Sequence, residues 1–257
     1  MSVHSKPDSE RDAILITAVG RQSFDAALDL LSSVDAVNPK RSTAIGAIDL
    51  GLGGAQRRAL IARGVTIATP PWPLRAPAGQ QRVGHLAQVI RPFSNLVFPG
   101  YRHYLWLDAD RRLRSPECWR TLIAAADRDG LAVPVQSRPA DPTVPWPERQ
   151  WLIQRLDRAY GIRKMLSLTS LPMVDPGIVA LRGDAPQWPS WQAETRRLVE
   201  RTRSVAAADR IALLHLVYVD EMPANLLEAR HGRIGSRANT TPASRPRSRS
   251  AAELSVV

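Results

Sequence analysis

Apolar and polar positions along the first 70 residues alternate between two periods. A short apolar run with β-branched residues spans 13–19 and predicts a buried strand. Positions 24–34 then repeat apolar side chains at helical spacing, and Asn38-Pro39 ends that pattern. We expect a second strand over 43–50, a helix over 55–63 that ends at Gly64, and a third strand over 65–68. This alternation predicts an α/β fold with right-handed crossovers.

The remaining pattern extends the same architecture and divides the chain. Further helices are expected over 83–90, 116–126, 151–160 and 191–203, and further strands over 104–107, 131–133 and 178–181. Four prolines between 136 and 147 predict an irregular loop, which an active-site flap would explain. We divide the chain into a polar leader, 1–11, one folded domain, 12–229, and a Ser-, Pro- and Arg-rich tail, 230–257, that we expect to be disordered.

Composition narrows the classes of partner. The formal net charge is +11, which points to an anionic ligand such as a nucleotide diphosphate, nucleic acid or an acidic membrane. Much of that excess lies in the tail, so the folded domain is less basic than the total. Cys118 is the only cysteine, which excludes an internal disulfide and a thiolate zinc site. With no visible secretory signal or membrane-spanning run, we expect a cytoplasmic protein and leave peripheral membrane contact open.

Asp108 and Asp110 follow directly on the apolar strand expected over 104–107. Residues i and i+2 of an extended chain face the same side, so both carboxylates can approach one cation. Mg²⁺ and Mn²⁺ take oxygen ligands that substrate phosphates commonly complete. Open α/β sheets bind ligands at the carboxyl ends of their strands. The pair therefore predicts a divalent metal site for a phosphate-bearing ligand.

Simpler interpretations of these and other residues stay open. The two aspartates would also suit a turn in which they pair with Arg111, Arg112 or Arg114. Asp49, beside several glycines, is either a nucleotide contact or a turn-capping carboxylate. Most large or titratable side chains in apolar surroundings are expected in the core or at its rim: Trp106, Trp119, Trp151, Trp188, Trp191, His85, His103, His215 and Cys118.

The run from Tyr104 to Asp110 resembles the metal-binding strand of GT-A fold glycosyltransferases, specifically family-eight-like enzymes. Other segments are similar to elements of that family in the same order: Ala47-Ile48-Asp49-Leu50-Gly51-Leu52, Arg91-Pro92-Phe93, Val174-Asp175-Pro176-Gly177-Ile178, and Asp209 with Ile211 to Leu214. The matching order covers residues 13 to 227. The resemblance implies a GT-A type nucleotide-diphospho-sugar transferase fold, with a mixed, mainly parallel sheet flanked by helices.

The resemblance also implies an activity and roles for single residues. It implies transfer of a hexose from a nucleotide-sugar donor, a UDP-sugar, to an acceptor hydroxyl, with Mn²⁺ or Mg²⁺ as cofactor. The implied metal ligands are Asp108 and Asp110, with Ala109 between them at the donor. The nucleotide would be lined by Thr17, Ala18 and Val19, Arg91 would approach the diphosphate or the sugar, and the residues implied to face the sugar in catalysis are Asp175 and Asp209.

Departures from the family pattern keep two alternatives in view. Asp175 stands where Asn is usual, Arg210 replaces a Gln, and the family's third metal ligand, a late His, is matched only by His231, which we expect to be a solvated tail residue. One alternative is therefore a catalytically impaired nucleotide-sugar binding module. The other is a basic nucleic-acid or membrane binder acting through its tail. No aromatic residues interleave Arg111, Arg112 and Arg114, which makes a nucleic-acid patch at those arginines less fitting, and we do not expect nucleic acid as a partner.

Overall fold

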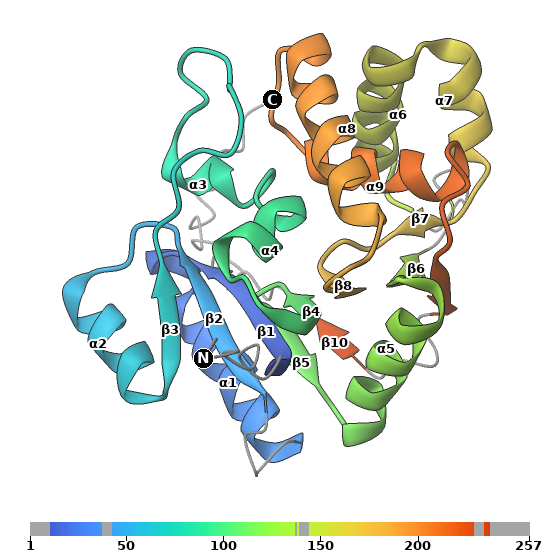
Figure 1. The fold of residues 1–257 in the computed structure, drawn as a ribbon. Helices are drawn as coiled ribbons and strands as arrows, with labels where there is room; N and C mark the ends of the chain where they lie inside the picture. Colours follow the sequence, from blue (N-terminus) through green and yellow to red (C-terminus); the bar gives the residue numbers. More distant parts are fainter. Residues whose placement is uncertain (1–10, 38–42, 137, 139–143, 229–233, 237–257) are drawn as a thin grey trace, which may run out of the picture.

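The computed structural model describes residues 11–37, 43–136, 138, 144–228 and 234–236 of the 257-residue chain. Its main sheet has eight strands, seven of which follow one path across it (Figure 1). In spatial order these are β3 (Val65–Ala68), β2 (Ala44–Asp49), β1 (Arg11–Val19), β4 (Tyr101–Leu107), β8 (Ile178–Arg182), β6 (Leu131–Gln136) and β7 (Met173–Val174). The eighth, β9 (Asn225–Glu228), pairs with β6.

The sheet is mixed, with a parallel half that contains the strands expected first from the sequence. β3, β2, β1 and β4 are mutually parallel, with Ile16 of β1 opposite Trp106 of β4. β8 lies antiparallel between β4 and β6, and β9 is parallel to β6. Helices flank the sheet, so the predicted fold class is confirmed.

Each helix expected from the sequence has a counterpart in the structure, and the structure adds helices over 94–97, 162–169 and 208–218 that were not expected. The described α-helices are α1 (Phe24–Val37), α2 (Gly54–Ala62), α3 (Val83–Leu86), α4 (Ser94–Val97), α5 (Pro116–Asp129), α6 (Trp146–Tyr160), α7 (Ile162–Thr169), α8 (Gln187–Thr202) and α9 (Ala208–Tyr218). Short 3-10 turns cover Arg21–Ser23 and Arg91–Phe93. In Figure 1, α6, α7, α8 and α9 gather beyond the β6–β8 side of the sheet, and α2 lies beside β3. No helix in the described part of the chain is long and apolar enough to cross a membrane.

Alternate residues of the strands belong to two hydrophobic cores, one on each face of the sheet. One core contains Ile16 and Trp106 and is completed by residues of α6, α8 and α9. The other contains Leu105 and Leu107 and is completed by α1 and α5. Because the side chains at 106 and 108 project to the same face, the end of β4 presents Asp108 toward the α8–α9 side.

Two predicted segments differ from the structure for identifiable reasons. The helix expected over 83–90 ends at Leu86, and the Gln88 side-chain and main-chain oxygens instead accept hydrogen bonds from the backbone N–H groups of Ala207 and Asp209, at 3.1 and 3.3 Å. The irregular loop expected over 136–147 stops before Trp146, where α6 begins. Its prolines misled the prediction because the first turn of a helix tolerates proline.

The predicted tail is described only in part. Ile234–Ser236 forms β10, which pairs antiparallel with β5 (Arg111–Leu113), so the expectation of disorder does not apply to these three residues. The rest of the tail, including His231, lies outside the described residues, as does the leader up to residue 10.

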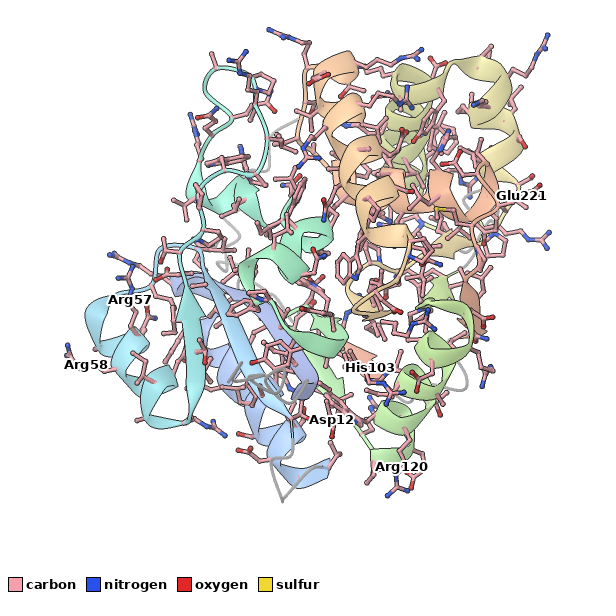
Figure 2. All side chains as sticks on the ribbon, viewed as in Figure 1. Asp12, Arg57, Arg58, His103, Arg120 and Glu221 are labelled. Carbon is pink, nitrogen blue, oxygen red and sulfur yellow. The ribbon has the colours of Figure 1, made fainter. Side chains whose placement is uncertain are left out.

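The amino-terminal edge of the sheet carries a polar cluster well away from Asp108. The ring nitrogens of His103 lie 3.1 Å from the carbonyl oxygen of Asp12 and 2.8 Å from Oδ1 of Asp127. Figure 2 shows His103 and Asp12 at this end of the molecule, near Arg120. His103 is buried, as is the free thiol of Cys118, in agreement with the sequence expectation.

Candidate active site

Arg91 joins two carboxylates that are far apart in the sequence. Its Nη2 donates to both oxygens of Asp108, at 2.8 and 3.0 Å, and its Nη1 donates to Oδ2 of Asp209 at 2.5 Å. The guanidinium carbon also lies 5.3 Å from the ring centroid of Trp106. Burial opposes the charge of Arg91, but the two carboxylates outweigh it and raise the pKa of Arg91 above its ordinary value. Arg91 is therefore a fixed cation at the centre of the site.

Asp108 is an ionised carboxylate with several donors around it. Trp106 Nε1 donates to its Oδ1 at 2.8 Å, as the shared face of positions i and i+2 allows. Burial alone would raise the pKa of Asp108, but Arg91, the Trp106 hydrogen bond and Arg111 together lower it. A third of the Asp108 side chain stays exposed, so it remains open to a ligand.

Asp209, at the start of α9, is almost completely buried. Its side chain is 1% exposed, and its two oxygens accept from Arg91 and from the backbone N–H of Arg210, at 2.7 Å to Oδ1. Burial raises the pKa of Asp209, against the opposing effect of Arg91. Both oxygens are thus engaged inside the protein, which makes Asp209 a support for Arg91 in this geometry.

Asp175 and Asp108 converge on Gly177. Arg111 Nη2 lies 3.0 Å from Oδ2 of Asp175, and the backbone N–H of Gly177 donates to Asp175 Oδ1 at 3.0 Å. A Cβ atom at position 177 would sit 2.8 Å from Asp108 Oδ2 and 3.0 Å from Asp175 Oδ1. Only a residue without a side chain leaves both carboxylates in place, so the glycine has a geometric role in the site.

Asp110 differs from the other aspartates in its exposure. Its side chain is 56% exposed, and Arg111 Nε lies 3.8 Å from its Oδ1. Ala109, between the two aspartates, is buried. Asp110 and the open lone pair of Asp108 Oδ2 offer the hard oxygen ligands that Mg²⁺ and Mn²⁺ prefer, and such ions often keep waters and substrate phosphates as their other ligands. Within the described residues, no cluster of three or more His, Cys, Asp or Glu side chains is placed to hold a metal, so a complete protein cage is not present there.

The residues expected to line the nucleotide lie one strand away from Asp108. Thr17, Ala18 and Val19 end β1, next to the end of β4, but the ion-pair network around Arg91 does not include them. The Thr17 side chain is buried and its Oγ1 has no hydrogen-bond partner in the described part of the chain. Asp49 caps its turn through the N–H groups of Gly51 and Leu52, which supports the structural interpretation of that residue.

Sequence reasoning identified the aspartates of the site but only some of their cationic partners. It offered Arg111, Arg112 and Arg114 as partners of the Asp108 pair. In the structure Arg91 is the direct partner of Asp108. Arg111 does pair with Asp110, at 3.8 Å, and helps to lower the pKa of Asp108, but it also pairs with Asp175. Arg112 pairs instead with Asp29, at 2.8 Å. The roles of Gly177 and of the Trp106 indole N–H were also missed. The i and i+2 spacing of Trp106 and Asp108 was a signal that could have shown the latter.

Comparison with known proteins finds similar structures but no protein that is similar in sequence. No protein-family model matches the sequence, and no curated protein matches it. Solved structures do match. An active-site mutant of LgtC has 13% sequence identity and a TM-score of 0.55, over 84% of this chain and 72% of that chain. The galactosyltransferase LgtC has also been solved with donor and acceptor sugar analogues.

Two further glycosyltransferases match at similar levels. Core-mannan synthase A from Aspergillus fumigatus, in its Mn/GDP form, has 10% identity and a TM-score of 0.57, over 90% of this chain and 76% of that chain. Mouse xyloside xylosyltransferase 1 has 11% identity and a TM-score of 0.51, over 84% and 85%. At such identities the likeness establishes the fold alone. The chain therefore has the GT-A glycosyltransferase fold that its sequence resemblance predicted.

Proposed function

We propose that the protein is a glycosyltransferase that moves a hexose from a nucleotide-diphosphate sugar, a UDP-sugar, to an acceptor hydroxyl. The observation that carries this proposal is the Arg91–Asp108 pair at the carboxyl end of β4, on a fold shared with glycosyltransferases. Carboxyl ends of strands are where open α/β sheets bind their ligands. The site combines a fixed cation with an exposed acidic side chain, Asp110, which suits a diphosphate together with a divalent ion.

In this proposal Asp108 and Asp110 hold Mg²⁺ or Mn²⁺, and Thr17, Ala18 and Val19 line the nucleotide. When bound, such an ion would supply Lewis-acid stabilisation of negative charge on the diphosphate leaving group. Neighbouring glycosyltransferases solved with Mn and GDP, or with donor and acceptor sugar analogues, support this assignment by fold.

Arg91 would supply the protein's own stabilisation of the leaving group. A guanidinium held by two carboxylates is already oriented before the donor arrives, so little reorganisation is needed as negative charge builds up on the diphosphate. Asp209 would act through Arg91 as a positioning residue. Asp175, held by Arg111 and 10% exposed, would face the transferred sugar and orient it through its hydroxyl groups.

Isothermal titration calorimetry of UDP with and without Mn²⁺ tests the proposal. We expect binding that depends on the metal and that Asp110→Asn removes, because this change deletes one anionic ligand while leaving the buried network intact. Asp157→Asn, on the exposed face of α6, is the matched control and should bind like the unmodified protein. Metal-independent binding, or none at all, would count against the proposal.

A catalytically impaired binding module is the second candidate. It is favoured by one observation, that both oxygens of Asp108 already accept hydrogen bonds from Arg91. This candidate predicts UDP binding without turnover. Release of UDP from a UDP-sugar, measured by a coupled assay under conditions where calorimetry shows binding, distinguishes the two functions.

A further inference from the structure

Arg210 is the third arginine of the site and the least compensated. It follows Asp209 at the start of α9, and its Nη2 donates to Oε1 of Gln136, the last residue of β6, at 2.9 Å. Gln136 offers a neutral amide oxygen, whereas Arg91 contacts two carboxylates and Arg111 contacts Asp175. No carboxylate in the described part of the chain lies within 4.0 Å of the Arg210 guanidinium nitrogens, although Asp175, Asp209 and Glu148 act on it at longer range.

The guanidinium of Arg210 also has hydrogen-bond donors to spare. The bond to Gln136 is the only hydrogen bond of its guanidinium among the described residues. Its Nε is buried without an acceptor there, as are the Nε atoms of Arg91 and Arg111, so the donors that remain for a ligand are those of the terminal Nη groups. The residue is half-buried, and burial lowers the pKa of Arg210. A guanidinium has five N–H donors in a planar fork that matches a carboxylate or a phosphate. A ligand carrying such a group would supply the direct anionic partner that Arg210 lacks among the described residues.

The position of Arg210 separates it from the proposed diphosphate site. In the sheet order, β1 lies on one side of β4, and β8 and then β6 lie on the other. Gln136 thus ends a strand two places beyond Asp108, on the side away from β1, a lateral separation of about 10 Å at ordinary strand spacing. If the nucleotide lies at the end of β1, as proposed above, Arg210 meets the part of the ligand beyond the diphosphate.

We infer that Arg210 recognises a carboxylate on a sugar unit, so that the site takes a hexuronate in preference to a neutral hexose. The inference rests on the proposed function, since it presumes that a UDP-sugar occupies the site. The hexuronate could be either the sugar of the UDP-sugar donor or a sugar of the acceptor. Both present the same carboxylate to the same guanidinium, and the experiment separates them.

The donor arm compares UDP-glucuronic acid with UDP-glucose by calorimetry in the presence of Mn²⁺. We expect the uronate to bind about 10- to 100-fold more tightly, the range of a charge-assisted hydrogen bond. Arg210→Gln should abolish that preference, and Arg210→Lys should keep part of it, since the charge remains and the fork is lost. Arg201→Gln, on the exposed face of α8, is the control and should keep the full preference.

The acceptor arm compares methyl glucuronide with methyl glucoside in the presence of saturating UDP and Mn²⁺, by ligand-observed NMR. An Arg210-dependent preference in either arm supports the inference and identifies its source. Equal affinities in both arms, or a loss of UDP affinity itself in Arg210→Gln with an unchanged urea midpoint, would overturn it. Binding of UDP without any uronate preference would refute this inference alone, whereas absence of UDP binding would refute the proposed function.

Discussion

Replacing Arg91 by Met should destabilise the protein in a pH-dependent way. The substitution keeps an unbranched side chain of similar length but leaves Asp209, 1% exposed, without its cation. Removing one partner of a buried ion pair typically costs about 3–5 kcal/mol. Burial already raises the pKa of Asp209, so protonation of this carboxyl would relieve part of the cost. We therefore expect a loss of unfolding free energy at the lower end of that range, about 3 kcal/mol near neutral pH. For a domain of this size, that corresponds to a fall of about 6–12 °C in Tm.

The sign of the pH dependence of this stability loss follows from the Asp209 carboxyl, which has lost its cation. Without Arg91 the folded-state pKa of Asp209 rises further above its unfolded value, so the folded variant binds a proton that the unfolded chain releases. The cost of the substitution should therefore shrink as the pH falls through that raised pKa, and should grow toward alkaline pH. Asp209→Asn in the Arg91→Met background should recover most of the loss, because no buried charge remains.

Urea unfolding followed by circular dichroism, at about pH 5.5 and about pH 8, measures both effects. Arg63→Met is the matched control. Arg63 also pairs with an aspartate at 2.8 Å, but both partners are about 30% exposed, and such pairs contribute about 0–1 kcal/mol. A cost for Arg91→Met that equals the control at both pH values would refute the view that Arg91 holds a buried carboxylate in its charged form.

Two further substitutions test the geometry around Asp108. Gly177→Ala places a methyl group 2.8 Å from Asp108 Oδ2. It should lower the free energy of unfolding in urea by about 1–3 kcal/mol and weaken metal-dependent UDP binding. Gly84→Ala is the control and should do neither, because the space at its Cβ position is open. Trp106→Phe removes the indole N–H that helps to lower the pKa of Asp108, so the carboxyl titration of Asp108, followed by NMR, should move to higher pH, and an unchanged midpoint would contradict the assigned hydrogen bond.

Local patterns predicted the elements that position Asp108 but not the partners that surround it. The apolar run over 104–107 marked β4, and the glycines after Asp49 suggested a capped turn as one of two interpretations, which the structure favours. Arg91 and Asp209 are 118 positions apart, and their contact arises only when α9 packs behind the turn that carries Arg91. A single sequence contains no periodic signal for such a pairing.

The helix that carries Asp209 was missed for a different reason. Nine residues of α9, from Ala208 to Val217, are buried, so it is apolar on nearly every side and lacks the amphipathic period that identifies a surface helix. A short apolar run of this kind does not distinguish a helix from a strand. The strand pattern over 178–181 was recognised, but the position of β8 between β4 and β6 depends on contacts between residues far apart in the sequence, which local patterns do not reveal.

The charge arrangement of the free site indicates how the metal and the nucleotide would depend on each other. Arg91 lies 2.8 Å from Asp108, so a divalent cation at that carboxylate would stand close to a fixed guanidinium and be repelled by it in a partly buried site. A diphosphate brings negative charge that attracts both cations and offers Arg91 new acceptors. In the calorimetric experiment proposed above, Mn²⁺ alone should therefore bind weakly and UDP should strengthen its binding, with equal reciprocal coupling in the other direction. Tight binding of Mn²⁺ without UDP would mean that Arg91 leaves Asp108 before any ligand arrives, and would contradict its assignment as the preorganised cation of the site.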